Sequence, residues 1–87
     1  DITMAMGRYG VKTKLSPEEV IQKAKTYFGE QGLHLTIVEE GACCISFEGG
    51  GGFVSLTLAE EEGKTDVDLT TREWMFDVQQ FMSAIAS

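Results

Sequence analysis

Few residues in this sequence have side chains suited to chemistry, and His34 is the first of them. It is the only histidine, and the alternation of the surrounding segment predicts Glu48 as its neighbour on the next strand. An imidazole beside a carboxylate can exchange protons near neutral pH, so the pair is a candidate for acid–base catalysis. Both residues are expected on an open polar face without an enclosing cleft. We therefore place an enzyme that uses His34 and Glu48 behind two other hypotheses and assign no catalytic residue.

The two cysteines, Cys43 and Cys44, are neighbours in the sequence. Adjacent side chains of a strand point to opposite faces, so a disulfide between them would be strained and two free thiols are expected. Cys43 is predicted in the core, and Cys44 on the open face beside Val38 and Thr57. Free thiols are typical of a reducing compartment, which predicts a cytoplasmic protein. Neither cysteine has a zinc-ligand spacing to His34, so no metal site and no cofactor are expected.

A run of glycines and a cluster of acids complete the candidates. Residues 49–52 are all glycine, but they lack the lysine and hydroxyl residue of a phosphate-binding loop. We interpret them as a flexible hairpin connection. Residues 60–62 are all glutamate, and Asp66 and Asp68 follow. Their spacing does not match a calcium-binding loop, so we expect solvated carboxylates balanced by Lys12 and Lys14 on a neighbouring strand.

Secondary-structure elements must position these side chains. The sequence clearly predicts the first two elements, a strand and a helix. Residues 9–15 alternate between apolar and polar side chains, which is typical of a strand. Ser16, Pro17 and Glu19 then form the signature of a capped helix start. The apolar stripe that follows, at helical spacing over residues 20–28, predicts a helix with one face buried.

Residues 33–71 alternate in four short segments separated by turn residues, which predicts four antiparallel strands. Apolar side chains all face one side if Ile37 pairs with Ile45, Phe47 with Val54, and Leu58 with Val67. The opposite side then carries two rows across the sheet. One predicted row is His34, Glu48, Phe53 and Arg72, and the next is Thr36, Ser46, Ser55 and Thr70.

A second helix is predicted after the last strand. Thr70 or Thr71 is expected to cap it, since Thr70 and Glu73 have capping-box spacing. Its apolar stripe runs from Trp74 to Ile85. Both helices can bury their stripes only against the single apolar sheet face, which predicts an α+β two-layer sandwich of order β-α-β-β-β-β-α. This element order resembles the TATA-binding-protein-like arrangement, which implies a curved antiparallel sheet with both helices on one side.

Length and charge limit the domain count and the class of partner. The chain has 87 residues, enough for one domain, which we place at residues 9–87. It begins at Asp1 rather than Met, so residues 1–8 are predicted to be a flexible N-terminus or to come from outside the natural protein. The formal net charge is −7, which disfavours nucleic acid and anionic membranes as partners because both need clustered basic residues.

The leading hypothesis is a small acidic, non-enzymatic interaction domain. We expect its open sheet face either to self-associate, as in a homodimer, or to dock on another protein. The residues predicted to form this face are Thr36, Val38, Cys44, Ser46, Phe53, Ser55 and Thr57. The alternative is a carrier of a small apolar ligand, bound between the last helix and the sheet. The residues predicted to bind that ligand are Trp74, Met75 and Met82, with Gly50 and Gly51 as its gate.

Overall fold

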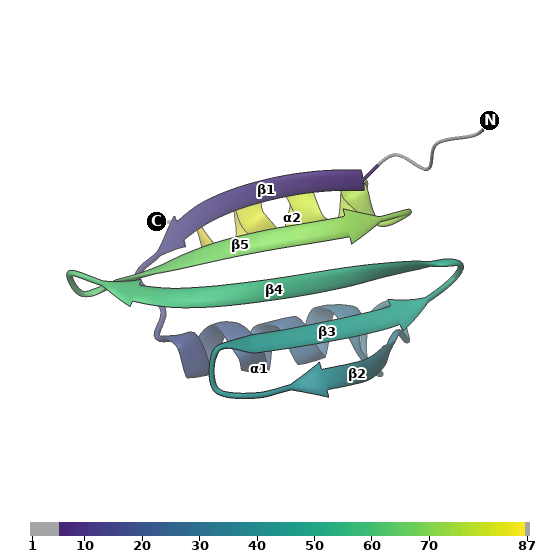
Figure 1. Ribbon diagram of the computed structural model, residues 1–87, viewed down its shortest axis with the longest axis horizontal. Helices are drawn as coiled ribbons and strands as arrows, with labels where there is room; N and C mark the ends of the chain where they lie inside the picture. The colour runs from purple at the N-terminus through teal and green to yellow at the C-terminus, as the bar shows by residue number, and fades with distance from the viewer. Residues whose placement is uncertain (1–5, 87) are drawn as a thin grey trace.

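A computed structural model describes residues 6–86 and confirms the α+β sandwich in the predicted order (Figure 1). The elements are β1 (Met6–Thr13), α1 (Pro17–Phe28), β2 (Thr36–Glu40), β3 (Cys44–Gly49), β4 (Gly52–Glu61), β5 (Lys64–Arg72) and α2 (Met75–Ile85). Strand β1 starts three residues before the predicted strand. Of the segment predicted to be flexible, Met6–Arg8 therefore belong to β1, and residues 1–5 lie outside the described residues.

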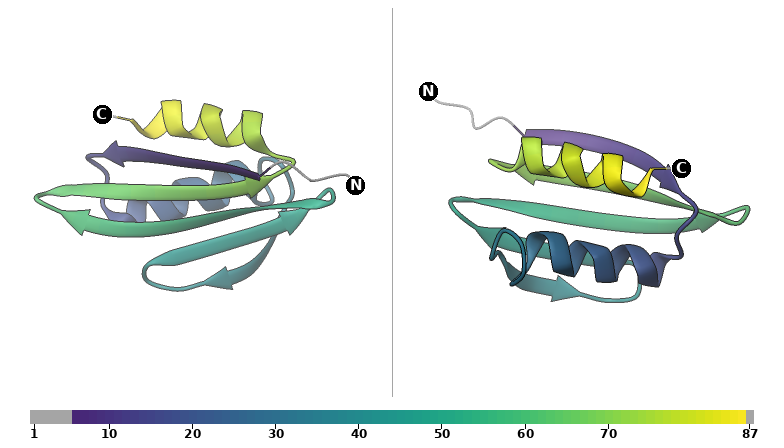
Figure 2. Two further views of the ribbon diagram at one scale, coloured as in Figure 1. Left: turned by 45° about the horizontal axis from the view of Figure 1, so that its top comes forward. Right: turned by 180° about the vertical axis from the view of Figure 1, so that it is seen from behind.

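The five strands form one antiparallel sheet in the order β1-β5-β4-β3-β2. Helix α1 carries the chain from β1 at one edge to β2 at the other, and β2 to β5 then follow one another as neighbours. Both helices lie on the same side of the sheet (Figure 2). Helix α1 packs on β3 and β4, while α2 packs on β5 and β1. The other side of the sheet carries no element of the described chain.

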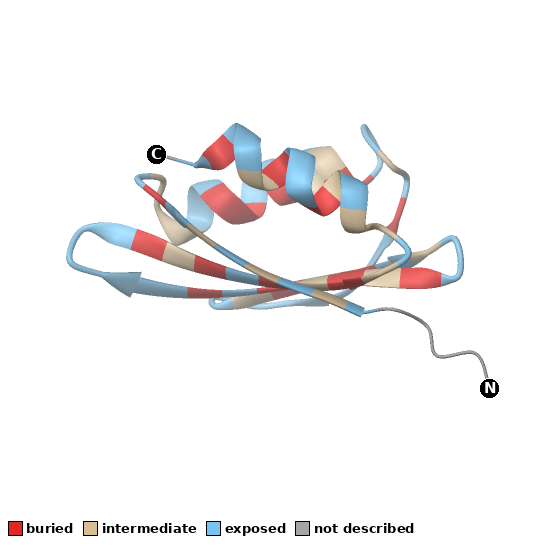
Figure 3. Cartoon of the chain, turned by 90° about the horizontal axis from the view of Figure 1, so that it is seen from above, coloured by how far each residue is buried: buried red, intermediate tan, exposed pale blue. Residues whose placement is uncertain are grey.

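The core fills the space between the helices and the sheet (Figure 3). Fifteen apolar residues are buried there: Val20, Ile21, Ala24, Phe28, Leu35, Ile45, Phe47, Val54, Leu56, Leu58, Val67, Leu69, Val78, Phe81 and Ile85. Phe28 lies at its centre, with its ring 5.5 Å from that of Phe47 and 5.2 Å from that of Phe81, centroid to centroid. The alternation of each strand thus sends its apolar side chains to one face, as predicted.

The start of α1 is as the sequence predicts. The Ser16 side chain accepts a hydrogen bond from the Glu19 N–H (3.2 Å), and the Glu19 carboxylate accepts one from the Ser16 N–H (2.9 Å). The predicted cap of α2 is wrong, because Thr70 and Thr71 belong to β5 and Trp74 is the N-cap without a side-chain hydrogen bond. Thr71 is buried, and its hydroxyl donates to the Phe53 carbonyl across the sheet (2.7 Å) instead.

The predicted register is confirmed in the centre of the sheet and wrong at its β2 edge. Phe47 pairs with Val54, and Leu58 with Val67, as predicted. Ile37, however, lies opposite Phe47 rather than Ile45. The connection from β2 to β3 is wider than a tight turn, and it is closed by a hydrogen bond from the Gly41 N–H to the Cys44 carbonyl (2.8 Å). This wider connection shifts every β2 pair.

Candidate functional site

The uncovered side of the sheet, which we call the open face, faces the viewer in Figure 1. Its side chains lie in rows, because directly paired residues of neighbouring strands project to the same side. The Phe53 row runs from β2 to β1 as Thr36, Glu48, Phe53, Arg72 and Met6. The Ser55 row runs as Glu39, Ser46, Ser55, Thr70 and Arg8. The Thr57 row runs as Cys44, Thr57, Asp68 and Gly10.

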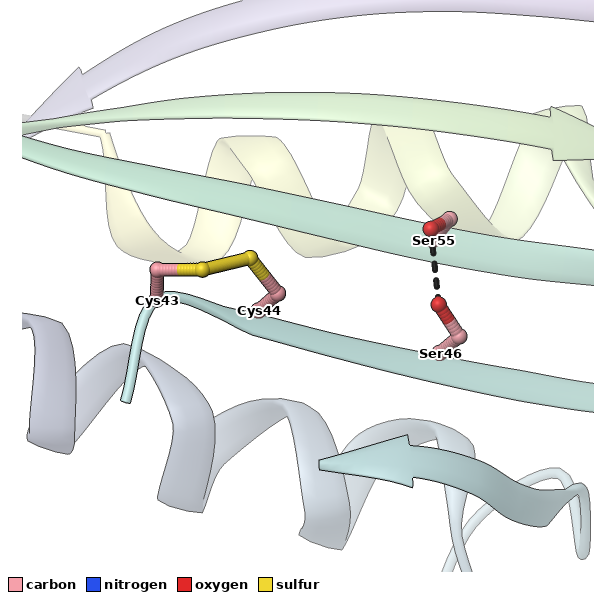
Figure 4. Close-up of a disulfide and its surroundings, with 4 residues drawn as sticks. All are labelled: Cys43, Cys44, Ser46 and Ser55. Atoms are coloured by element: carbon pink, nitrogen blue, oxygen red, sulfur yellow. Dashed lines mark hydrogen bonds between the residues drawn. A yellow bond between two sulfur atoms is a disulfide. The ribbon is translucent and has the colours of Figure 1, made fainter. Parts of the chain in front are cut away.

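The centre of the open face is made of small hydroxyl side chains. The Ser46 and Ser55 hydroxyls point toward each other across β3 and β4 and form a hydrogen bond of 2.8 Å (Figure 4). Thr70 continues this row on β5, and Thr57 is exposed in the row beside it. Short side chains leave the sheet surface low and even, so a second flat surface can approach it closely.

Charged residues lie on both sides of this centre, toward the β2 and β1 edges. The Arg72 guanidinium lies over the Phe53 ring, 5.7 Å from its centroid. Its Nε atom is buried and has no hydrogen-bond partner in the described chain. Arg8, Glu39 and Glu48 are exposed and, within residues 6–86, form no ion pair. In the Phe53 and Ser55 rows the open face therefore carries unpaired bases on the β1 side and unpaired acids on the β2 side.

The predicted balance between acids and lysines is confirmed only in part. Lys12 Nζ lies 3.8 Å from the Asp66 carboxylate on the paired strand β5. Lys14 lies beyond the end of β1 and opposite no residue of β5, while Asp68 pairs with Gly10. Asp68 thus remains exposed without an ion pair in the described chain.

The expectation of two free thiols is wrong, since Cys43 and Cys44 are joined in a disulfide at the start of β3 (Figure 4). The alternation rule that argued against this bond does not apply, because Cys43 lies in the bend before β3 and only Cys44 belongs to the strand. Cys43 is exposed and not in the core. Cys44 lies on the open face opposite Thr57, as predicted. The disulfide removes the thiols on which the expectation of a cytoplasmic protein was based.

The predicted contact between His34 and Glu48 is also wrong. Glu48 lies opposite Thr36, and His34 precedes β2 in a loop where it is exposed and has a positive φ of 64°. A left-handed residue breaks the alternation that placed His34 on the open face. His34 and Glu48 are therefore not the directly paired cross-strand neighbours that the acid–base hypothesis required.

A β-bulge explains why β2 departs from its predicted face. Ile37 pairs with Phe47 and Glu39 with Ser46, so Val38 is an extra residue in β2. The bulge places Glu39 on the open face, where the Ser55 row was predicted to contain Thr36. Val38 is 52% exposed and borders the open face beside Thr36 and Phe53. The alternation itself held a signal for the bulge, since continuing it from Ile37 would turn Glu39 into the core.

Sequence reasoning missed Glu39 and Arg8 as residues of the open face. Glu39 was missed because of the bulge. Arg8 was missed because residues 1–8 were set aside as a flexible terminus, although β1 and its alternation begin at Met6. The remaining residues predicted for the face, Cys44, Ser46, Phe53, Ser55 and Thr57, lie on it in the predicted rows.

Part of the predicted ligand-binding set comes together, but as a packed contact. Trp74 Nε1 donates a hydrogen bond to the Gly49 carbonyl (3.0 Å), and its ring lies against Gly50. Gly51 is exposed at the tip of the turn. Met75 and Met82 are only partly buried on α2. The space between α2 and the sheet is filled by the buried side chains Val78, Phe81 and Ile85.

Among the described residues, no cluster of three or more His, Cys, Asp and Glu side chains could hold a metal ion. None of the helices in that part of the chain combines the length and apolar character of a membrane span. No protein-family model matches the chain, and no curated protein matches it in sequence. The geometry of the open face is thus the basis for a functional proposal.

Proposed function

We propose that this chain is a non-enzymatic interaction domain that binds a protein through the open face of its sheet. The observation that carries the proposal is the contrast between the two sides of the sheet. One side is covered by both helices, whereas the other presents a low centre of Ser46, Ser55 and Thr57 bordered by charges without ion pairs in the described chain. Such a mixture of a flat centre and a charged border suits a polar protein–protein contact.

The test is a substitution that changes the open face without disturbing the core. Thr57→Lys places a long charged side chain in the centre of the face, at an exposed position beside Asp68. Gln80→Lys, on the exposed surface of α2, is the matched control with the same change in charge. We expect Thr57→Lys to weaken association at least ~10-fold, because a charge is then desolvated in the contact, and Gln80→Lys to leave it unchanged.

Light scattering over a wide concentration range measures self-association, and capture with immobilised domain measures binding of other proteins. Association that responds to Thr57→Lys and not to Gln80→Lys supports the open face as the binding surface. Association that is equal in wild type and Thr57→Lys, or that Gln80→Lys also weakens, would contradict it. Circular dichroism of both variants establishes that the fold is retained.

The apolar-ligand carrier remains the second candidate. The residues predicted for it, Trp74 with Gly50 above all, already contact one another, and the inward side of α2 is filled. No observation on this side of the described chain favours a ligand over this packing. The open face is therefore the better supported site.

A further inference from the structure

The open face is self-complementary about a two-fold axis that runs along β4. From this we infer that the partner of the face is a second copy of the same chain. The inference rests on the proposed function, because it names the partner of the same surface. Strand β4 is the middle strand of the order β1-β5-β4-β3-β2. A half-turn about β4 lays a second open face on the first and exchanges the position of β3 with β5, and of β2 with β1.

The Phe53 row matches itself under this rotation. Arg72 on β5 comes to lie over Glu48 of the second copy, and Glu48 over Arg72 of the second copy. Phe53 of each copy lies on the axis, one against the other. Each guanidinium thus meets a carboxylate beside two apposed aromatic rings, an environment in which Arg–carboxylate pairs are favoured over Lys pairs.

The Ser55 row matches in the same way. Arg8 on β1 comes to lie over Glu39 of the second copy, while Ser55 lies on the axis and Thr70 faces Ser46. None of the bases and acids that the two rows bring together forms an ion pair within the described chain. The Lys12–Asp66 pair, which is already satisfied, lies near the end of the face and outside both rows.

Apolar side chains at the edges follow the same symmetry. Met6 on β1 is 56% exposed, and the rotation places it over Thr36 of the second copy, beside the 52% exposed Val38. In the Thr57 row, Asp68 comes over Cys44 of the second copy and gains no basic partner. Two rows therefore favour the arrangement, and the third supplies no ion pair.

The area of the open face sets the expected affinity of the dimer. Five strands at about 4.8 Å and three rows about 6.8 Å apart give a face on the order of 24 by 20 Å, or roughly 500 Å² per copy. The total of roughly 1,000 Å² is in the range of weak, transient protein contacts, below that of stable specific interfaces. Aligned packing, in which the strand directions of two sheets lie within about 30° of each other, is a common way to cover such faces. We expect a reversible dimer rather than a permanent one.

A two-fold axis perpendicular to the strands is the competing arrangement. It would bring Arg72 over Asp66 of the second copy, but Asp66 already pairs with Lys12, and Glu39 and Glu48 would meet no base. Of these two axes, the one along β4 gives both glutamates a basic partner. The two arrangements can be separated experimentally, because only the first makes Glu48 and Arg72 a pair.

The experiment is a charge swap between two separately purified variants, Arg72→Glu and Glu48→Arg. Each variant alone places like charges opposite each other twice, so we expect its dimer dissociation constant to rise at least ~30-fold. In an equal mixture, a heterodimer brings the two substituted side chains together and leaves the two native ones together, so both contacts again join a base to an acid. We expect the mixture to associate within ~10-fold of wild type in sedimentation velocity. Arg8→Glu with Glu39→Arg is a second swap at exposed positions, which decides the matter if Arg72→Glu does not fold.

Each outcome bears on one proposal. Restoration on mixing supports the axis along β4. Single variants that dissociate without restoration on mixing overturn this axis, while the open face remains the interface. A dimer that neither swap affects overturns the inference as well. At about 1 mM even a weak contact of ~4 kcal/mol is half occupied. Wild-type protein that stays monomeric up to this concentration therefore rules out a second copy as the partner. The proposed function is then judged by the Thr57→Lys capture experiment alone.

Discussion

Replacing Gly50 with alanine tests the contact between the β3–β4 turn and Trp74. Gly50 and Gly51 form a two-residue turn with φ values of 59° and 81°, as favoured hairpin turns require. A Cβ at Gly50 would lie 2.6 Å from Cζ2 of Trp74, whereas a Cβ at Gly51 would meet nothing within 4 Å. The two positions therefore share the backbone strain and differ in the steric clash.

The cost of each substitution follows from these terms. A left-handed non-glycine residue costs about 1–2 kcal/mol at either position. At Gly50 the indole must also move, and such overpacking adds about 1–3 kcal/mol. Movement of the ring would further weaken the 3.0 Å hydrogen bond from Trp74 Nε1 to the Gly49 carbonyl, a loss of about 1 kcal/mol. We expect Gly50→Ala to lower the free energy of unfolding by about 2–4 kcal/mol more than Gly51→Ala, the sum of the overpacking and the weakened hydrogen bond.

The assay is urea unfolding followed by circular dichroism, since Trp74 is the only tryptophan and its fluorescence would itself change. In a Trp74→Phe background the smaller ring removes the clash. The excess cost of Gly50→Ala over Gly51→Ala should then disappear. Equal losses for the two alanine variants in the wild-type background would refute the reasoning, and so would an excess that persists with phenylalanine at position 74.

Three further predictions concern the core, an ionisable tyrosine and the disulfide. Phe28→Ala should lower the free energy of unfolding by about 3–5 kcal/mol, since Phe28 is fully buried. Phe76→Ala, at a 71% exposed position, should change it by less than ~0.5 kcal/mol in the same urea titrations. Burial and, second, the nearby Asp77 carboxylate raise the pKa of Tyr27 above 10.0. The contribution of Tyr27 to the free energy of unfolding is therefore fully present below pH ~10 and is lost as the pH rises further. Asp77→Asn should lower the Tyr27 pKa, measured in absorbance titrations against a Tyr27→Phe blank. Unfolded protein should react with no thiol reagent before reduction and with two equivalents after it, because Cys43 and Cys44 are disulfide-bonded; two equivalents without reduction would contradict the bond.

The parts of the fold that the sequence predicted are those set by local chemistry. Ser16 and Glu19 cap α1 through neighbouring backbone groups, and no distant residue is needed. The pairs of β3, β4 and β5 followed from alternation, because a one-residue slip would turn every apolar side chain outward. The short turns at Gly50–Gly51 and at Glu62–Gly63, whose residues have positive φ, fixed the register between the strands that they join.

The parts that it did not predict depend on competition between local and distant partners. Thr71 has the composition of a helix cap, but its hydroxyl bonds to the Phe53 carbonyl in the sheet. Neighbouring residues of a strand point to opposite sides, so the bulge that turns Glu39 outward directs Glu40 toward α1, where its carboxylate lies 2.9 Å from Lys25 Nζ. The bulge in turn placed Glu39 on the open face. This part of the candidate site therefore depends on a contact with α1, which alternation within β2 does not contain.

The two edges of the sheet explain why association is expected on the open face rather than along the strands. Strand β2 has five residues and a bulge at Val38, which leaves a short and irregular edge for pairing. Strand β1 is longer and regular, but its open side carries Arg8 and Lys12. Pairing with β1 of a second copy would bring these bases together, and like charges on paired strands are destabilising. In the proposed dimer, by contrast, the same Arg8 meets Glu39 of the second copy. The charges that disfavour edge pairing are therefore among those that make the face complementary to itself.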